Sequence, residues 1–231
     1  MRFASCLLCC CLLPGCAEKY EIKAAVPEKA LPNKAALAVV RIDVGGSIAG
    51  SGVVVTPQGH IVTASTTFPR YRTGEITVGE DRIKASVVAI DGRHQLALLK
   101  SERPLAVWAK FGPAGGPARD VSARIVGYAV VQSEPPMAER RNCSSRIEDP
   151  HYRGDSADDL DLHDLLVTET MNDVEGLKIG GSAVFVLDDG RLAGVVIGRM
   201  RTFGPSPLLA IPSATVRSFL GSRQIAVPSE D

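Results

Sequence analysis

The sequence predicts an all-β fold in which short strands form two clusters and a single helix ends the chain. Three observations lead there. From residue 36 onward, apolar runs rich in Val, Ile and Thr alternate with turn residues. Gly and Pro are frequent, at 22 and 15 of 231 residues, and no helix-length periodic segment separates the runs, which excludes a parallel α/β sheet. Such strands must hide their edges, so two small barrels or a sandwich are the physical options.

The first cluster lies between residues 36 and 100. Its expected strands are residues 36–43, 51–56, 60–65, 75–79, 82–91 and 95–100. The turn Pro57-Gln58-Gly59 joins the second and third of these runs as a hairpin. The other runs are bounded by Gly, Pro or Asp, which favour turns because of their backbone preferences and short polar side chains.

A second cluster follows a divider rich in Gly and Pro at residues 110–120. Its expected strands are residues 121–130, 165–170, 182–189, 192–198 and 208–212. Asp188-Asp189-Gly190 predicts a tight turn between two of them. Residues 213–221 have a helical pattern, in which Ser213 is expected to cap the start and Gly221 to end the helix. Val216 and Leu220 would share one face of this helix.

Composition excludes several function classes. Hydrophobic residues make up 45% of the chain, which is too apolar for intrinsic disorder. The 26 basic and 26 acidic residues balance, so no nucleic-acid or polyanion partner is predicted. Five of the six cysteines lie within the first 16 residues, which leaves only Cys143 in the body and therefore no disulfide framework there. No cofactor motif is found.

The first 16 residues have the layout of an export signal. Arg2 precedes a short apolar run, which is too short to span a bilayer as a mature helix. The segment Leu13-Pro14-Gly15-Cys16 resembles a bacterial lipobox. The resemblance implies that residues 1–15 are a lipoprotein signal peptide, that Cys16 is lipidated, and that residues 16–34 form a charged tether. A cleaved secretory peptide is the alternative. In both cases the mature protein lies outside the cytoplasm, and with the lipid it is anchored at the cell envelope, facing the periplasm or the exterior.

Four ordered segments resemble trypsin-fold (chymotrypsin-like) serine proteases of the Deg/HtrA-type bacterial branch. They are Gly50–Val55 with Ile61–Thr63, Asp91–Lys100, Gly180–Val184, and Leu209–Pro212 with the helix that follows. The resemblance covers about residues 36–221. It implies two six-stranded antiparallel Greek-key barrels with a C-terminal helix, spanning residues 35–222 as barrels at 35–109 and 118–222. A tail at 223–231 follows, and no PDZ domain is expected.

The positions that carry the family's chemistry are all substituted. The catalytic histidine follows the hairpin's Thr63 by three residues, which places it at Thr66. The aspartate precedes the Leu-Ala-Leu-Leu-Lys run, at Gln95, and the nucleophilic serine precedes Gly-Gly, at Ile179. The glycine that helps to build the oxyanion hole falls at Leu177. The resemblance therefore implies a degenerate triad with no intact catalytic residue.

These substitutions remove each chemical role. Ile179 has no heteroatom and forms no acyl intermediate, Thr66 is not a base at neutral pH, and neutral Gln95 does not stabilise an imidazolium. The sequence thus predicts a pseudoprotease that binds an extended peptide or protein partner through the old cleft. Two alternatives stay open. One is an active serine endopeptidase with a relocated site using Ser182 with His60 or His94, and the other is a purely structural envelope lipoprotein.

Residues 132–164 are predicted to form a long loop, with an arginine-rich patch followed by an acidic stretch. Cys143 is expected to be an exposed or partly covered thiol in this loop; its alternative is a nucleophile activated by nearby arginines. The arginines are Arg140, Arg141 and Arg146. Potential metal ligands are His151, Asp159, Asp161 and His163. Their spacing matches no known motif, so no metal is predicted. A partner-binding surface is a further possibility for the loop.

Overall fold

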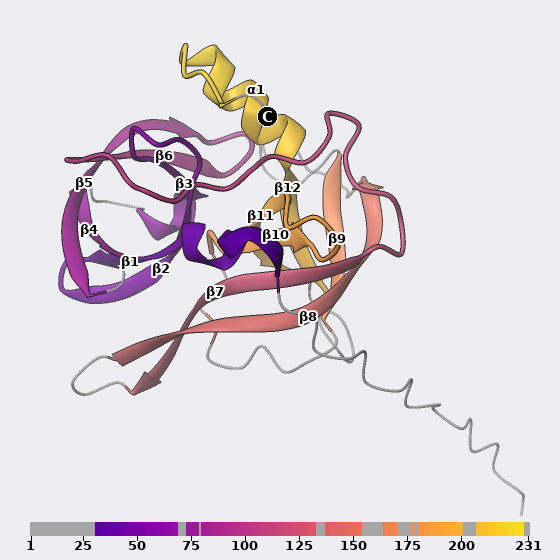
Figure 1. The fold of residues 1–231 in the computed structure, drawn as a ribbon, viewed down its shortest axis with the longest axis horizontal. Coiled ribbons are helices and arrows are strands. Elements are labelled where there is room, and N and C mark those ends of the chain that lie inside the picture. The colour runs from indigo at the N-terminus through magenta and orange to yellow at the C-terminus, as the bar shows by residue number, and fades with distance from the viewer. Residues whose placement is uncertain are drawn as a thin grey trace, which may run out of the picture.

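The computed structural model describes residues 31–68, 73–78, 80–132, 137–153, 164–170, 177, 180–200 and 207–228. Within these residues, twelve strands form two closed antiparallel barrels, and the helix α1 packs at the end of the chain. Figure 1 shows the two barrels side by side, with α1 in yellow at the top of the second. This confirms the predicted fold class.

The N-terminal barrel has the strand order β1-β2-β3-β6-β5-β4. Its strands are β1 (Val39–Val44), β2 (Ser47–Val54), β3 (His60–Ala64), β4 (Thr73–Val78), β5 (Asp81–Asp91) and β6 (Leu96–Ser101). Pairing of β1 with β4, through Ile42 and Ile76, closes the barrel. Both of these side chains are fully buried in a core that also contains Ile61, Ile83 and Leu99.

The C-terminal barrel follows the same path, in the order β7-β8-β9-β12-β11-β10. Its strands are β7 (Ser122–Gln132), β8 (Met137–Tyr152), β9 (Leu165–Thr170), β10 (Ala183–Val186), β11 (Leu192–Arg199) and β12 (Leu208–Pro212). Pairing of β7 with β10, through Ile125 and Val184, closes it. The two halves of the chain therefore repeat one strand topology, as the two-cluster pattern of the sequence indicates.

Glycine placement explains two of the predicted turns. Gly59, between β2 and β3, and Gly190, between β10 and β11, adopt φ of +86° and +68°. Residues that have a Cβ are strained in this left-handed region, because the Cβ comes too close to the backbone, whereas glycine is not. The predicted hairpin at residues 57–59 and the predicted turn at residues 188–190 are confirmed.

The ends of the folded region differ from the expectation in detail. The 3-10 helix η1 (Pro32–Ala38) includes residues 36–38, which were assigned to the first strand, and the last residues of the expected tether. In α1 (Ser213–Ser222), Pro212 occupies the N-cap position and Ser213 is the first helical residue, so Ser213 is not the cap. Gly221 lies inside the last turn. Val216 and Leu220 are fully buried and do share a face.

The predicted loop at residues 132–164 is wrong over much of its length. Residues 137–152 form β8, the longest strand, which pairs with β7 from Ser122↔Arg146 to Gln132↔Met137. Cys143, Ser145 and Ile147 alternate inward and are buried. Arg146 among them and the charged residues that precede Cys143 hid this period-two pattern in the sequence. Figure 1 shows β7 and β8 extending as a long hairpin beneath the N-terminal barrel.

One apolar core crosses from barrel to barrel. It joins side chains of the first barrel such as Val53 and Leu96 to side chains of the second such as Val126 and Val195, together with Val216 of α1. The barrels are thus docked through buried apolar surface. No helix within the described ranges is long and apolar enough to cross a membrane.

Candidate functional site at the junction of the barrels

Ser51 of β2 is the centre of the junction between the two barrels. Its N–H donates to the carbonyl oxygen of Gly180 at 3.0 Å, and its hydroxyl accepts a hydrogen bond from the Tyr128 N–H at 2.8 Å. Its carbonyl accepts a hydrogen bond from Oγ1 of Thr63 at 2.6 Å. Ser51 is fully buried, so the three bonds satisfy its polar groups while they tie the first barrel to β7 and to the Gly180-Gly181 turn.

This turn requires glycine at position 181. Gly181 has φ of +79°, and a Cβ added to it would lie 1.9 Å from the Ser51 oxygen and 2.2 Å from Thr63 Oγ1. Its N–H donates to the Val196 carbonyl at 2.8 Å, which fixes the turn against β11. The backbone of one barrel therefore sits directly on the backbone of the other at this point.

Thr66, where the resemblance expects the family's histidine, lies beside this turn. It belongs to the short 3-10 helix η2 (Ser65–Thr67) that follows β3, and its side chain is exposed. A Cβ added to Gly180 would lie 3.7 Å from Thr66 Oγ1. The neighbouring Thr67 is buried and its hydroxyl lies 3.3 Å from that of Thr63. The exposed Thr66 thus faces the Gly180-Gly181 turn, whereas the buried Thr67 forms a hydroxyl pair with Thr63.

Gln95, where the resemblance expects the family's aspartate, lies against the same segment. Its carbonyl accepts a hydrogen bond from the Ser65 N–H at 2.8 Å, just where β3 and β6 pair through Ala64 and Leu96. Gln95 has φ of +54°, an uncommon conformation for a residue other than Gly, Asn or Asp. The structure therefore brings Thr66 and Gln95 together, although 29 residues separate them in sequence.

Leu177 and the turn define the second barrel's side of the site. Leu177 forms an isolated antiparallel bridge with Ala129 and is only 7% exposed, within the apolar core of the second barrel. Ile179, between Leu177 and Gly180, lies outside the described residues, and so does Cys16. The place of the Ile179 side chain stays a prediction, whereas the backbone that follows it lies next to Thr66.

The described groups supply little acid–base chemistry. Thr66 offers a hydroxyl, and Gln95 at the aspartate position offers an amide; neither titrates near neutral pH. Within the described residues, no group of three or more His, Cys, Asp or Glu side chains is placed to hold a metal ion. The arrangement presents hydrogen-bond donors and acceptors without a charge.

The residues considered for a relocated site lie apart in the fold. Ser182 is fully buried against β7, where a Cβ on Gly127 would lie 2.2 Å from its hydroxyl oxygen. His60 begins β3 and its Nδ1 contacts the Thr56 hydroxyl at 2.8 Å. Burial lowers the pKa of His60, as does the nearby Lys100 charge. His60 pairs across the sheet with Lys100. His60 lies three residues along β3 from Thr63, and three residues of strand span roughly 10 Å.

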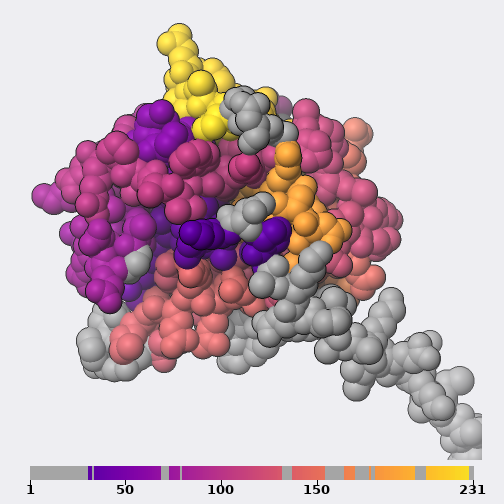
Figure 2. All heavy atoms as spheres, in the orientation of Figure 1, coloured from indigo at the N-terminus to yellow at the C-terminus, as the bar shows by residue number. Residues whose placement is uncertain are grey.

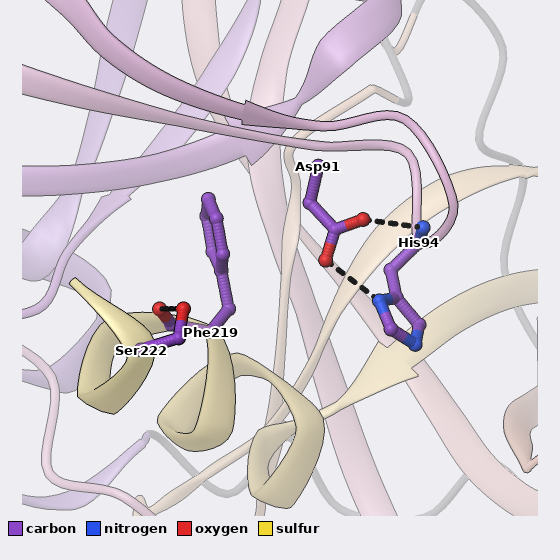
Figure 3. A network of polar contacts seen from close by, with 4 residues as sticks. All are labelled: Asp91, His94, Phe219 and Ser222. Carbon is purple, nitrogen blue, oxygen red and sulfur yellow. Dashed lines mark hydrogen bonds and ion pairs between the residues drawn. The ribbon is translucent and has the colours of Figure 1, made fainter.

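His94 forms a tight pair with Asp91 in the β5–β6 turn (Figure 3). The imidazole Nδ1 lies 2.7 Å from the carboxylate, and the His94 N–H donates to the other carboxylate oxygen at 3.1 Å. Burial alone would raise the pKa of Asp91, but the hydrogen bonds from His94 lower it overall. In Figure 3 the nearby Ser222 hydroxyl turns onto its own helix, where it donates to the Phe219 carbonyl at 2.7 Å.

Two further predictions concern β8 and its surroundings. Cys143 is not in a loop: it faces the core of the second barrel and is 5% exposed. This burial removes the accessibility that a nucleophile needs. His151 pairs with Asp164 through Nδ1 at 2.6 Å. The other three potential ligands, Asp159, Asp161 and His163, lie outside the described residues.

Comparison with known proteins decides the family. Residues 50–195 match the model of the trypsin-like peptidase domain, which is more than half of the chain. The chain belongs to the trypsin-like peptidase family. No curated protein matches it in sequence.

Solved structures share the fold of this trypsin-like chain. Rv3671c protease of Mycobacterium tuberculosis, in an inactive form, superposes with a TM-score of 0.65 at 18% identity, covering 84% of this chain and 97% of that one. The protease domain of MamO from Magnetospirillum magneticum gives 0.62 at 18% identity, covering 82% and 99%. The HtrA-type protease AlgW with a decapeptide gives 0.67 at 15% identity, covering 81% and 64%. At these identities, the likeness establishes the fold alone.

Sequence reasoning missed the residues that dock the barrels. Ser51, Thr63 and Tyr128 were not singled out as partners, although Ser51 lies within the Gly-Ser-Gly motif that carried the resemblance. The only local signal is that motif's glycine at position 50, where an added Cβ would lie 2.8 Å from the Gly180 oxygen. A close approach of this kind explains why glycine is found there.

Proposed function

We propose that this trypsin-like chain is a catalytically inactive protease homologue that binds a peptide or protein partner at the barrel junction. The observation that supports the proposal is that Gln95 lies against the segment carrying Thr66, because the Ser65 N–H donates to the Gln95 carbonyl at 2.8 Å, and both residues stand where the resemblance expects triad members. The third position is Ile179, and a hydrocarbon side chain offers no nucleophile wherever it points.

The loss of the triad removes peptide-bond hydrolysis but does not affect the docking of the two barrels. Removing one triad member leaves roughly 10³–10⁴-fold catalysis over water in serine proteases. Here all three positions differ, and Leu177 stands at the oxyanion glycine. The bonds of Ser51 to Gly180 and Tyr128 hold the two barrels together without any of these side chains.

Binding of an extended peptide needs backbone groups at a strand edge and no triad. One fold relative, the HtrA-type protease AlgW, is found in complex with a decapeptide. For this chain we propose the same class of ligand, an extended peptide segment, next to Thr66. The uncharged side chains at positions 66 and 95 favour a neutral contact surface there.

We further propose that the protein is lipid-anchored through Cys16, after removal of residues 1–15, and faces the periplasm or exterior of the bacterial envelope. The support is the Leu13–Cys16 segment behind its apolar run. The test is Cys16→Ser: we expect a soluble, unprocessed protein in place of a membrane-bound one. Equal processing and equal membrane attachment of the variant contradict the anchor.

Activity and binding need separate experiments. For activity, the full chain is incubated with casein and with a serine-reactive fluorophosphonate probe. We expect no hydrolysis and no labelling. Hydrolysis abolished by the probe contradicts inactivity, and loss of that labelling in Ser182→Ala then identifies a relocated nucleophile.

For binding, a photo-crosslinking amino acid replaces Thr66 in cells, and Lys84 on the exposed side of β5 serves as the matched control position. We expect crosslinked adducts at position 66 and none at position 84, and we expect a competing unlabelled partner peptide to abolish them. Equal adducts at both positions, or none at either, contradict a partner site at the junction and favour a purely structural protein.

A further inference from the structure

An apolar pocket of about 410 Å³ opens between the first barrel and the β7–β8 hairpin. Eight of its ten lining residues are aliphatic and come from η1, β1, β2, β4 and the segment 105–107. Tyr128 of β7 and Arg140 of β8 are the other two. Figure 2 shows the first described residues, in indigo, lying against this hairpin. The volume falls in the range of small-molecule sites, roughly 300–1,000 Å³.

The floor of the pocket is hydrocarbon in character. Val39, Val40 and Val54 are at most 2% exposed, whereas Leu37 at the rim is 41% exposed. Pairing within a closed barrel occupies the strands of the floor, for example Val39↔Val53 and Val54↔Ile61. The surface favours a ligand with an unbranched apolar chain.

The polar side of the pocket carries the positive charge of Arg140. The Arg140 guanidinium donates to the Ala36 carbonyl at 3.3 Å, and no carboxylate among the described residues lies within ion-pair distance of it. The adjacent Arg141 and the nearby Arg41, by contrast, pair with Glu139 at 3.1 Å and Asp43 at 2.9 Å. Burial raises the pKa of the Tyr128 phenol, although Arg140 and Arg41 act in the opposite direction. The phenol is thus a neutral donor at pH 7.

We propose that this pocket binds a free fatty acid, with its carboxylate on Arg140 and its alkyl chain against Val39, Val40 and Val54. Arg140 supplies the charge complement of a monoanionic head, and the aliphatic floor supplies the complement of the chain. This site is independent of the proposed function, because it uses neither Thr66 nor Gln95. It adjoins the junction through Tyr128, whose backbone N–H donates to Ser51.

The single tryptophan of the chain provides the assay. Trp108 follows the lining residue Val107 and is 36% exposed. The full chain is reconstituted in phosphatidylcholine vesicles and titrated with 12-bromododecanoate, because bromine quenches an indole that it contacts. We expect saturable quenching that unlabelled dodecanoate reverses. Quenching that rises linearly with the probe and is not reversed by dodecanoate overturns the site.

Paired variants test the two halves of the ligand. Arg140→Gln should raise the half-saturating concentration about tenfold, since a charge-assisted contact is lost. Arg141→Gln, one residue away and paired with Glu139, is the matched control and should change nothing. The neutral 12-bromododecanol should bind the unaltered chain about tenfold more weakly and should not respond to Arg140→Gln. Equal binding of acid and alcohol overturns the assignment of Arg140 as the carboxylate partner.

A third variant covers the case in which Arg140→Gln perturbs folding. Ala106 is exposed at the rim of the pocket, so Ala106→Phe adds bulk at the mouth without touching Arg140. We expect it to abolish saturable quenching by both the acid and the alcohol. Unchanged saturation in Ala106→Phe shows that the probe binds elsewhere and refutes the pocket.

Discussion

Gly181→Ala is the substitution that tests the docking of the two barrels most directly. The added methyl would lie 1.9 Å from the Ser51 oxygen and 2.2 Å from Thr63 Oγ1, and the residue would keep a left-handed φ of +79°. The left-handed conformation costs roughly 1–2 kcal/mol for a residue with a Cβ. Overpacking of a filled interior costs roughly 1–3 kcal/mol more. We therefore expect the free energy of unfolding to fall by about 2–5 kcal/mol.

Equilibrium urea unfolding measures this loss. Gly115→Ala is the control, because no atom lies within 4 Å of a Cβ added there and its φ is not in the left-handed range. We expect the control to lie within about 1 kcal/mol of the unaltered chain. If Gly181→Ala unfolds at the same urea concentration as the control, then the turn does not contact Ser51 and Thr63. The place of the segment after Ile179 relative to Thr66 would then be wrong too.

Three further predictions address the site and its surroundings. Leu177→Ala should lower the free energy of unfolding by about 2–4 kcal/mol in urea titrations, because a side chain that is 7% exposed leaves a cavity in the second barrel. Asp91→Asn should destabilise the chain at pH 7. Because His94 holds the folded-state pKa of Asp91 below its usual value, this difference is present above about pH 4 and shrinks as the pH falls further. In casein assays, Thr66→His, Gln95→Asp and Ile179→Ser should each stay inactive, and we expect hydrolysis only when all three are combined with Leu177→Gly.

The barrels were predictable because their strands carry local signals. Val- and Ile-rich runs ended by Gly, Pro or Asp recur along the chain, and two of the expected hairpins have glycine where φ is positive. The order of the strands within each barrel depends instead on contacts distant in sequence, such as β1 with β4. That order came from the resemblance and not from the residues themselves.

β8 was not predictable, since its pattern is weak in sequence. Over residues 137–142 both faces of the strand are exposed or half-buried, so charged side chains occur in succession. Only the stretch from Cys143 to Ile147 alternates inward, and two of its three inward residues are Cys and Ser. A strand that protrudes beyond its barrel gives little hydrophobic periodicity, because it has no core on either side. The same burial converts Cys143 from an expected loop thiol into a core residue.

The positions of Thr66 and Gln95 followed from counting along motifs, yet their proximity depends on pairing of β3 with β6. The approach of Thr66 to the space beside Gly180 depends further on docking of the barrels. Neither proximity can be predicted from the local sequence, because each joins residues that lie far apart along the chain. For the same reason the apolar pocket beside Tyr128 was not foreseen, since seven separate segments of the chain contribute its walls.

The junction separates two constraints that coincide in an active protease. One is structural: Gly181 must lack a Cβ because the Ser51 carbonyl of the other barrel occupies that space, and this holds whether or not any reaction occurs. The other is chemical and falls on positions 66, 95 and 179, whereas the bonds of Ser51 across the junction are made with the backbones of Gly180 and Tyr128. Substitution at those positions therefore leaves the turn and the barrels in place. The Gly180-Gly181 turn therefore indicates that the two barrels dock, and it does not indicate whether the chain is catalytic.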